Sequence, residues 1–317
     1  MHACRCILLA ENRATVSIFV PLCQQLLFFS YYYLLEGQRC CICKVMRFMK
    51  YAVVIPARNE EEHIEKTLSA LKQQTVPPNQ IVVVDDGSTD RTGSIASEYT
   101  DVVIKLPHRE HSIAGKPELA KVVNEGLRRV EKDVDYVLVC GADHVLPRDY
   151  FEAIIGRMRL NPKIVVASGR IRGEPYFEFA PRGSGRVVDA DFWRETSNLQ
   201  YPVEWGWEAW LFFKAMQLGY DVRCFRDLVT EIQRPTRLVK AGSWGKAMYA
   251  LGYDWKYALG RCVLTFFQSP KAGLNMFSGW LLHKDVRRLD VADWVNLMQK
   301  NEFWKRVQTV IRRGGRK

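Results

Sequence analysis

Residues Tyr51–Asp90 read YAVVIPARNEEEHIEKTLSALKQQTVPPNQIVVVDDGSTD, and this stretch decides the fold. Two short β-branched runs, Ala52–Ile55 and Ile81–Val84, have the uniform apolar character of strands that are buried on both faces of a parallel sheet. The segment between them places apolar side chains at helical spacing, with Ile64 and Leu68 among them. The stretch therefore predicts a βαβ unit.

Polar residues follow each of the two predicted strands. Pro56–Asn59 comes after the first strand and Asp85–Asp90 after the second. In open parallel sheets, ligands bind in the crevice beyond the carboxyl ends of the strands. We therefore expect Asp85 and Asp86 to offer carboxylate acceptors to a base N–H and to ribose hydroxyls. The alternative is a polar strand-to-turn corner, in which Gly87 supplies backbone freedom.

The segments IPARNEEEHIEKTLSAL (residues 55–71) and VVVDDGSTDRT (residues 82–92) resemble the amino-terminal signature of the family 2 glycosyltransferases of GT-A fold. The resemblance implies an α/β, GT-A-like mixed sheet flanked by helices over residues 46–235, with a nucleotide-diphosphate sugar as donor and transfer with inversion. It implies a nucleotide pocket formed by Pro56, Ala57, Glu60, Asp85 and Asp86.

Alternating strands and helices continue past Asp90. The segment AGKPELAKVVNEGL resembles the Lys-containing helix that precedes the central strand in this family, which places Lys121 and Asn124 near the nucleotide edge and lets the lysine contact a phosphate. The alternative for Lys121 is a solvated helix face on which it neighbours Glu125. The predicted elements are a strand at 102–106, a helix at about 117–130 and strands at 136–140 and 165–169.

Gly141-Ala142-Asp143-His144 follows the strand at 136–140, where the family has an Asp-x-Asp motif that holds a divalent cation against the diphosphate. The first aspartate is missing. Mg2+ and Mn2+ bind through one or two carboxylates together with phosphate oxygens and water, so Asp143 remains a sufficient protein ligand. The resemblance therefore implies Mg2+ or Mn2+ at Asp143, whereas His144 is read either as a further ligand or as a hydrogen-bonded surface residue.

The segment EWGWEAWLFFKAMQLGYDV, from Glu204, resembles the family's catalytic helix start. An inverting transferase needs a carboxylate that deprotonates the acceptor hydroxyl. Ala209 stands where the family has an aspartate, so Glu208, or else Glu204, is expected to substitute as the base. Alternatively this helix start is structural, with Trp207 and its neighbouring aromatics in the core and the glutamate favouring the helix N-terminus.

Composition is that of a globular protein, with 48% apolar, 12% aromatic and 26% charged residues. The charge is uneven: residues 226–317 hold 18 Lys and Arg against 7 Asp and Glu, whereas residues 46–225 hold 24 against 26. The net charge of +11 thus matches the surplus of the last part. Such an excess is either a solvated basic face or attracts anionic lipid headgroups or a phosphorylated acceptor. Nucleic acid is not expected, because no binding motif accompanies the charge.

The first 45 residues differ from the rest, with six of the nine cysteines and a nearly uncharged run at 15–35. This run is about long enough for a signal anchor, but it contains Pro21 and two glutamines. The rival interpretation is that translation starts at Met46 or Met49. The remaining three cysteines are scattered, which predicts reduced, packed thiols in a cytoplasmic protein.

Residues 236–317 are expected to form a basic helical extension that resembles one found in archaeal and bacterial members acting near membranes. Charged and polar residues interrupt the apolar stretch 257–283, so it does not read as a spanning helix. It is either an interfacial amphipathic pair at the cytoplasmic membrane face or a helical subdomain packed on the sheet. The acceptor stays open, with a polyprenyl phosphate or a glycolipid as candidates.

Two other classes of protein are weighed against an active glycosyltransferase. Gly141 and Ala209, at positions where the family has carboxylates, favour a catalytically impaired nucleotide-sugar-binding protein that acts as a partner or sensor. A nucleotidyltransferase would have a glycine-rich basic phosphate loop after the first strand, and Ala57-Arg58-Asn59-Glu60 lacks that character.

Overall fold

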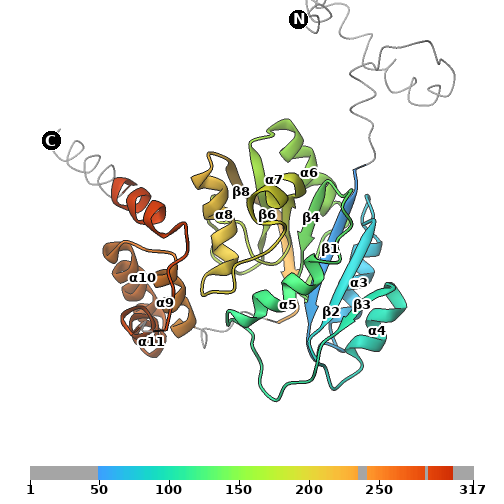
Figure 1. The fold of residues 1–317 in the computed structure, drawn as a ribbon, viewed down its shortest axis with the longest axis horizontal. Helices are drawn as coiled ribbons and strands as arrows, with labels where there is room; N and C mark the ends of the chain where they lie inside the picture. Colours follow the sequence, from blue (N-terminus) through green and yellow to red (C-terminus); the bar gives the residue numbers. More distant parts are fainter. Residues whose placement is uncertain (1–48, 235–240, 283–284, 303–317) are drawn as a thin grey trace, which may run out of the picture. The chain divides into compact units, whose positions relative to one another are not determined.

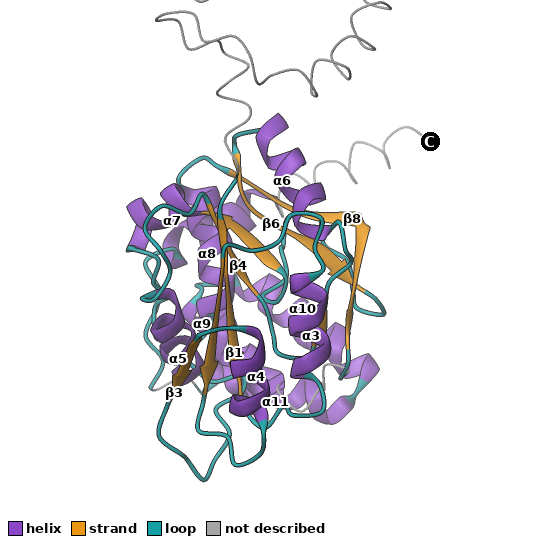
Figure 2. Ribbon diagram, turned by 90° about the vertical axis from the view of Figure 1, so that its right-hand side faces the viewer, coloured by secondary structure: helices purple, strands orange, loops and turns teal. Residues whose placement is uncertain are grey.

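The computed structural model of the protein describes residues 49–234, 241–282 and 285–302. They belong to one compact unit that begins at Met49. Within these ranges eight strands form one sheet in the order β3-β2-β1-β4-β7-β6-β8-β5, and helices cover both of its faces (Figures 1 and 2). The predicted α/β class is confirmed. The expectations for residues 1–45 lie outside the described residues.

The predicted βαβ unit consists of β1 (Tyr51–Ala57), α3 (Ile64–Lys72) and β2 (Gln80–Asp85). β1 is buried along almost its whole length because β2 and β4 (Tyr136–Val139) pair with it in parallel on either side. Its register with β2 ends at Ala57 beside Asp85. The strand ends that carry the predicted nucleotide residues therefore meet at one edge of the sheet.

The rest of the first half follows the predicted alternation. α4 (Thr92–Tyr99) leads to β3 (Val102–Lys105), which pairs in parallel with β2, and α5 (Glu118–Leu127) leads to β4. α5 packs closely on the sheet, since a Cβ at Gly126 would lie 2.6 Å from Val54 Cγ1. The first half is thus a parallel α/β layer with α5 packed on one face of its strands.

The second half makes the sheet mixed. β7 pairs antiparallel with both β4 and β6, and β6 pairs in parallel with β8. The short β5 (His144–Val145) pairs antiparallel with the end of β8, which brings the end of β8 beside the loop that follows β4. The elements are α6 (Tyr150–Leu160), β6 (Ile164–Ile171), β7 (Arg186–Asp189), α7 (Ala190–Ser197), α8 (Trp207–Gln217) and β8 (Asp221–Ile232).

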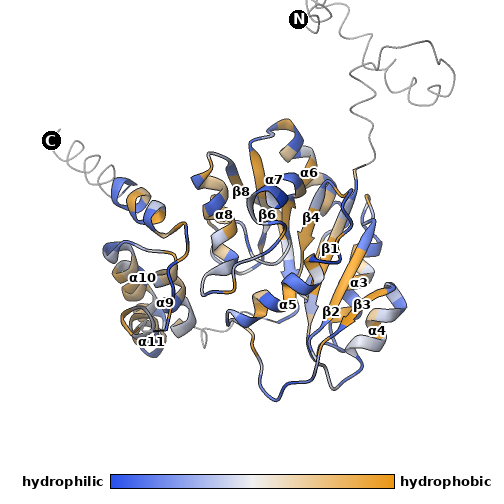
Figure 3. Cartoon of the chain, viewed as in Figure 1, coloured by the Kyte–Doolittle hydropathy of each residue, from blue (hydrophilic) through white to orange (hydrophobic). Residues whose placement is uncertain are grey.

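Two apolar cores lie on opposite faces of the sheet. One core is built around Ile64 of α3 and Phe151 of α6, and the other around Trp193, Trp207 and Trp210. Figure 3 shows the apolar strands that both cores share. The tryptophans at the start of α8 are therefore core residues, as the structural interpretation of that segment predicted. The three cysteines within the described residues, Cys140, Cys224 and Cys262, are free and buried.

The carboxy-terminal extension is helical where it is described. It contains α9 (Ala241–Ala250), α10 (Trp255–Gln268), α11 (Pro270–Leu281) and a helix over 292–302. Leu251, Leu289 and Val295 join Trp210 in the core on the α8 side. Parts of the extension on either side of the stretch 257–283 therefore pack against the core that also contains α8.

Candidate functional site

The carboxyl ends of β1, β2 and β4 form the floor of the candidate site. The backbone N–H of Asp86 donates to the carbonyl of Ala57 at 2.8 Å, which joins the residues after β1 and β2. The backbone N–H of Cys140 donates to the carbonyl of Val54 at 3.1 Å and brings the loop after β4 to the same edge. The parallel register thus places Pro56, Ala57, Asp86 and Asp143 at the carboxyl edge of the sheet.

Asp85 and Asp86 have different environments. Asp85 accepts the backbone N–H of Ser88 at 2.9 Å and packs so tightly on α4 that a Cβ at Gly93 would lie 2.5 Å from its Oδ2. Asp86 forms an ion pair with Arg109, and its Oδ1 is buried with no hydrogen-bond partner among the described residues. Asp85 therefore shapes the turn, as the corner interpretation expected, while Asp86 retains an acceptor for a ligand.

Burial dominates the electrostatics of Asp86, which is 3% exposed. It raises the pKa of this carboxyl more than the neighbouring Arg109 and Arg58 guanidinium groups lower it. A buried carboxylate oxygen that has lost its hydrating water and has no hydrogen-bond partner destabilises the folded protein. Such a group, at a strand end where ligands bind, is typical of a functional site.

The loop over residues 107–111 covers this carboxylate. Arg58 donates to the carbonyl of His111 at 3.3 Å and also to that of Arg109, while His108 Nδ1 lies 2.9 Å from the carbonyl oxygen of Gly87. Gly87 has a φ of 68°, and a Cβ there would lie 2.6 Å from the backbone of His108. Only glycine allows both this turn and the close approach of the loop.

A second charged cluster joins three elements that are distant in sequence. Arg234, after β8, forms ion pairs with Glu60 and with Asp143, where its Nε lies 3.4 Å from Asp143 Oδ2. Arg234 reaches Asp143 because β5 pairs with β8. Next to this pairing, the backbone N–H of Gln233 donates to the carbonyl of Asp143 at 2.8 Å. Glu60 Oε2 is buried without a hydrogen-bond partner in the described structure. Burial, and secondarily the charge of Asp143, raise the pKa of Glu60 against the opposing effect of Arg234.

This cluster fits a divalent cation in charge but not in ligand number. Two carboxylates already share a guanidinium cation, so a positive charge between them is favourable. Over the described ranges, no group of three or more His, Cys, Asp and Glu side chains is placed to hold a metal ion. A divalent cation at Asp143 would therefore need phosphate oxygens and water as its remaining ligands, which is common for Mg2+.

Glu208 lies on the other side of the turn formed by Gly183 and Ser184. A Cβ at Gly183 would lie 2.9 Å from Glu208 Oε1. On the opposite side, Ser184 Oγ accepts the backbone N–H of Gly141 at 2.7 Å, and a Cβ at Gly141 would lie 3.2 Å from both Ser184 Oγ and Asp143 Oδ1. One two-residue turn thus separates the predicted base from the predicted metal ligand.

Buried Arg186 fixes the position of that turn. Its guanidinium donates to the carbonyls of Pro181 and Arg182, both at 2.9 Å, and to that of Glu208 at 2.5 Å. Three carbonyls from two segments are therefore held by one side chain that is 1% exposed. Arg186 positions the start of α8 against the turn.

Two residues of the same region, His144 and Arg182, have lowered pKa values. Burial lowers the pKa of His144 to about 4, so its imidazole is uncharged at neutral pH, and its Nδ1 lies 2.5 Å from Ser184 Oγ. Burial also lowers the pKa of Arg182, against the effect of the Glu208 carboxylate. His144 is buried, so its interpretation as a surface residue was wrong. Its ring is nevertheless hydrogen-bonded, as that interpretation required.

Other predicted residues have different positions from those expected. Asn124 is buried and its side chain bonds both the backbone N–H and the carbonyl of Tyr201, at 2.8 and 2.9 Å, so it has a structural role. Lys121 is exposed on α5, and Glu125 forms its ion pair with Arg128. Ala209 packs against the core beside Trp207 and Trp210.

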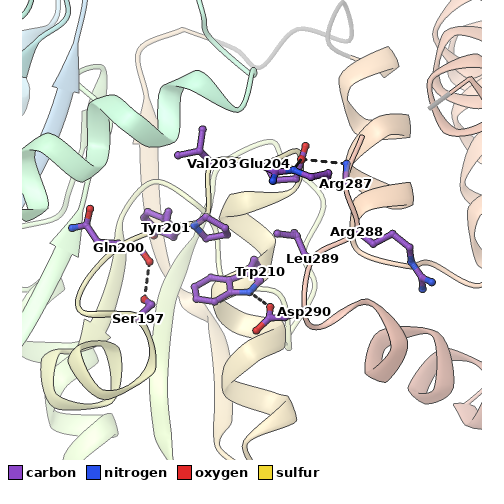
Figure 4. A pocket seen from close by; sticks show the side chains of 11 residues that line it. Ser197, Gln200, Tyr201, Val203, Glu204, Trp210, Arg287, Arg288, Leu289 and Asp290 are labelled. Atoms are coloured by element: carbon purple, nitrogen blue, oxygen red, sulfur yellow. Dashed lines mark hydrogen bonds and ion pairs between the residues drawn. The ribbon is translucent and has the colours of Figure 1, made fainter. Parts of the chain in front are cut away.

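Glu204, the alternative base, belongs to a separate hollow with a volume of about 490 Å³ (Figure 4). Its carboxylate lies 3.6 Å from Arg287 Nε and accepts the backbone N–H of Trp205 at 2.8 Å. On the other side of this hollow, Trp210 Nε1 donates to Asp290 at 2.6 Å. None of the strand-end carboxylates lines it, so this hollow is distinct from the candidate site.

Comparisons with known proteins agree with this geometry. A family model described as glycosyl transferase family 2 matches residues 52–219. "Glycosyltransferase GlyA" of Streptococcus pneumoniae is 32% identical over 130 residues, or 41% of this chain and 17% of that protein. "Probable glycosyltransferase YdaM" of Bacillus subtilis is 36% identical over 99 residues, or 30% of this chain and 23% of that protein. The alignments thus span less than a quarter of these two relatives.

Solved structures support the GT-A-type fold. The mannosyltransferase PcManGT of Pyrobaculum calidifontis, in complex with GDP-Man and Mn2+, has a TM-score of 0.53 at 16% identity and covers 82% of each chain. S. aureus TarS, in complex with UDP-GlcNAc, has a TM-score of 0.51 at 16% identity, with 78% of this chain and 84% of that chain covered. At these identities the likeness concerns the fold alone.

Proposed function

This chain belongs to glycosyl transferase family 2, and we propose that it transfers a sugar, with inversion, from a nucleotide-diphosphate sugar to an acceptor hydroxyl or phosphate. The observation that carries the proposal is the buried, unpartnered Oδ1 of Asp86 at the carboxyl edge of the sheet. Beside it lie a second carboxylate cluster and, past one turn, a glutamate at a helix start. These three groups follow one another in an order that suits the nucleobase and ribose, then the diphosphate, and then the acceptor.

In the proposed complex, Asp86 accepts a base N–H or a ribose hydroxyl, and Pro56 and Ala57 form the wall on which the base rests. Glu60 has a free buried oxygen nearby, so it is a second acceptor for the nucleoside. Asp85 is the weaker candidate, because its carboxylate already serves the turn. PcManGT was solved with GDP-Man and TarS with UDP-GlcNAc, so both donor classes are worth testing.

The diphosphate would lie against Arg234 and Asp143. A divalent cation at Asp143, Mg2+ or Mn2+, would neutralise the leaving diphosphate as a Lewis acid. Arg234 pairs with the same carboxylate, so donor binding is expected to turn its guanidinium from Asp143 towards the phosphates. Lys121, exposed on α5, remains a candidate for a further phosphate contact.

Glu208 would act as the base. The acceptor oxygen forms a bond to the anomeric carbon while the bond from that carbon to the diphosphate breaks, and the acceptor proton passes to Glu208. The nucleoside diphosphate leaves with the electron pair of the broken bond. The assignment is supported by the position of Glu208 beside Gly183, next to Ser184, which contacts the loop that carries Asp143.

Donor turnover tests this function. The full chain should release nucleoside diphosphate slowly from one UDP-, GDP- or dTDP-sugar even with water as the acceptor, and Glu208→Gln should reduce that release without loss of donor binding. Donor binding with no release by the parent would favour the binding-protein alternative. In that case the Gly141→Asp/Ala209→Asp double variant should gain transfer, whereas measurable parental turnover excludes that alternative.

A further inference from the structure

The three helices α9, α10 and α11 form a small layer in which α11 lies in the middle. A Cβ at Gly279 of α11 would lie 2.2 Å from the carbonyl oxygen of Gly242 on α9, and a Cβ at Gly273 of α11 would lie 2.6 Å from Phe266 on α10. α10 therefore packs on α11 and is the outer helix of the layer. Its buried residues, Ala258 and Cys262, are small and lie one turn apart.

The remaining surface of α10 is unusually apolar. Trp255, Leu259, Val263 and Phe267 are each four residues apart, so they form one stripe, and the last of them is 81% exposed. Charged residues normally occupy the solvent face of a surface helix, with the apolar stripe turned inwards. Nine of the sixteen large apolar side chains exposed within the described ranges lie on α10, on α11 or directly after α11: Trp255, Leu259, Val263, Leu264, Phe266, Phe267, Leu274, Leu281 and Leu282.

The charge on these two helices has one sign. Residues 255–282 contain Lys256, Arg261 and Lys271 and no acidic residue. Arg261 and Lys271 are exposed together with the apolar side chains. A second copy of the chain seated on this face would bring these like charges together, whereas anionic lipid headgroups would pair with them.

α10 and α11 are also too short to cross a bilayer. Among the described residues, no helix is long and apolar enough to span a membrane. An amphipathic helix with aromatic and aliphatic side chains on one face and basic residues at its margin lies in the plane of the interface. α10 has such an exposed stripe, and Arg261 lies one turn before the exposed Leu264 on the same helix.

We propose that α10 and the adjoining α11 dock this protein onto the surface of an anionic phospholipid bilayer. Trp255, Leu259, Phe266 and Phe267 enter the boundary between headgroups and acyl chains, and Arg261 and Lys271 bind headgroup phosphates. The docking face follows the Arg234 strand end along the chain, separated from it by α9 and the segment before it. The docking itself does not depend on the proposed transfer activity.

Sedimentation of the full chain with lipid vesicles tests the proposal. We expect the protein to pellet with vesicles of phosphatidylcholine and phosphatidylglycerol and much less with phosphatidylcholine alone. Leu259→Ser/Phe267→Ser should weaken binding to the anionic vesicles by at least about tenfold, because two exposed apolar anchors are lost. The matched control, Leu160→Ser/Phe177→Ser, removes an exposed leucine and an exposed phenylalanine from other parts of the protein and should bind as the parent does.

Several results would overturn the docking. The first is a parent that binds neither vesicle, and the second is a Leu259→Ser/Phe267→Ser variant that binds like the control. The third is self-association of the parent without lipid that this variant abolishes, which would assign the face to a second copy of the chain. Thermal shift by donor nucleotides, measured on the same variants, should not change. Failure of the docking and failure of the donor site are therefore distinguishable.

Discussion

Replacement of Asp86 by asparagine separates the binding role of this side chain from its structural cost. Asparagine has nearly the same shape, but its amide carries no charge and one of its two acceptor oxygens becomes a donor nitrogen. The Oδ1 of Asp86 is buried without a partner, and Oδ2 pairs with Arg109. If the free oxygen accepts a base N–H or a ribose hydroxyl, the variant loses a charge-assisted hydrogen bond to the donor.

The size of the expected effect follows from that bond. Hydrogen bonds to charged groups contribute about 1.5 to 3 kcal/mol, and about 1.4 kcal/mol corresponds to a tenfold change in affinity. Asp86→Asn should therefore raise the Kd for the nucleotide by roughly 10- to 100-fold.

Stability should respond in the opposite direction. Burial raises the pKa of Asp86 in the folded protein above its unfolded value, so the protonated form is favoured by folding. The stabilisation that this group contributes is present below the unfolded pKa, about 3.9, and is lost as the pH rises through the folded pKa. At neutral pH the ionised carboxylate thus costs stability. Asp86→Asn should melt at the same temperature as the parent or higher at pH 7, and it should lack this part of the pH dependence.

Isothermal titration with UDP- and GDP-sugars, combined with melting curves from pH 4 to pH 8, measures both effects. Asp227→Asn is the control, because Asp227 pairs with Arg157 on the surface and should leave the Kd unchanged. An Asp86→Asn protein with the parent's Kd would refute the assignment of Asp86 to the donor pocket. A large fall in melting temperature at pH 7 would refute the reasoning about its burial.

The other variants test the catalytic half of the site. Glu208→Gln should lower turnover by about 10²- to 10⁴-fold, the usual contribution of a general base, with an unchanged donor Kd; turnover near the parent's would exclude Glu208 as the base. Gly183→Ala places a Cβ 2.9 Å from the Glu208 carboxylate and should cost about 10²-fold in turnover by displacing it, with Gly156→Ala, in open space, as a comparison for the backbone change. Arg186→Met leaves three carbonyls without their donor and should destabilise the fold by about 3 kcal/mol or more. Denaturant unfolding measures this loss, and a free energy of unfolding equal to the parent's would contradict the positioning role of Arg186.

The sequence predicted the strands that position the front half of the candidate site, because local patterns determine them. Uniform β-branched runs define β1 and β2, and the parallel register then carries Ala57, Asp85 and Asp86 to one edge. A pattern of letters does not separate the two aspartates, however. The difference arises from contacts with Gly93 and Arg109, which depend on how the chain folds back over β2.

The back half depends on contacts between distant segments. Arg234 escaped prediction because only the antiparallel pairing of β5 with β8 brings it beside Asp143. Asn124 was placed near the nucleotide from its position in α5, but its amide is buried against Tyr201, 77 residues away. The proximity of Gly183 and Glu208 likewise requires Arg186 to join two segments. No local signal in the sequence announces such contacts.

The melting temperature of the full chain with and without donors tests the central claim most directly. We expect one of the UDP-, GDP- and dTDP-sugars, in excess with Mn2+, to stabilise the protein by about 2 to 3 kcal/mol, or roughly 5 to 10 °C for a protein of this size. The shift should need Mn2+ and should vanish in Asp143→Ala. A folded parent whose melting temperature responds to none of these nucleotides would contradict the assignment of a nucleotide-sugar site to this edge of the sheet.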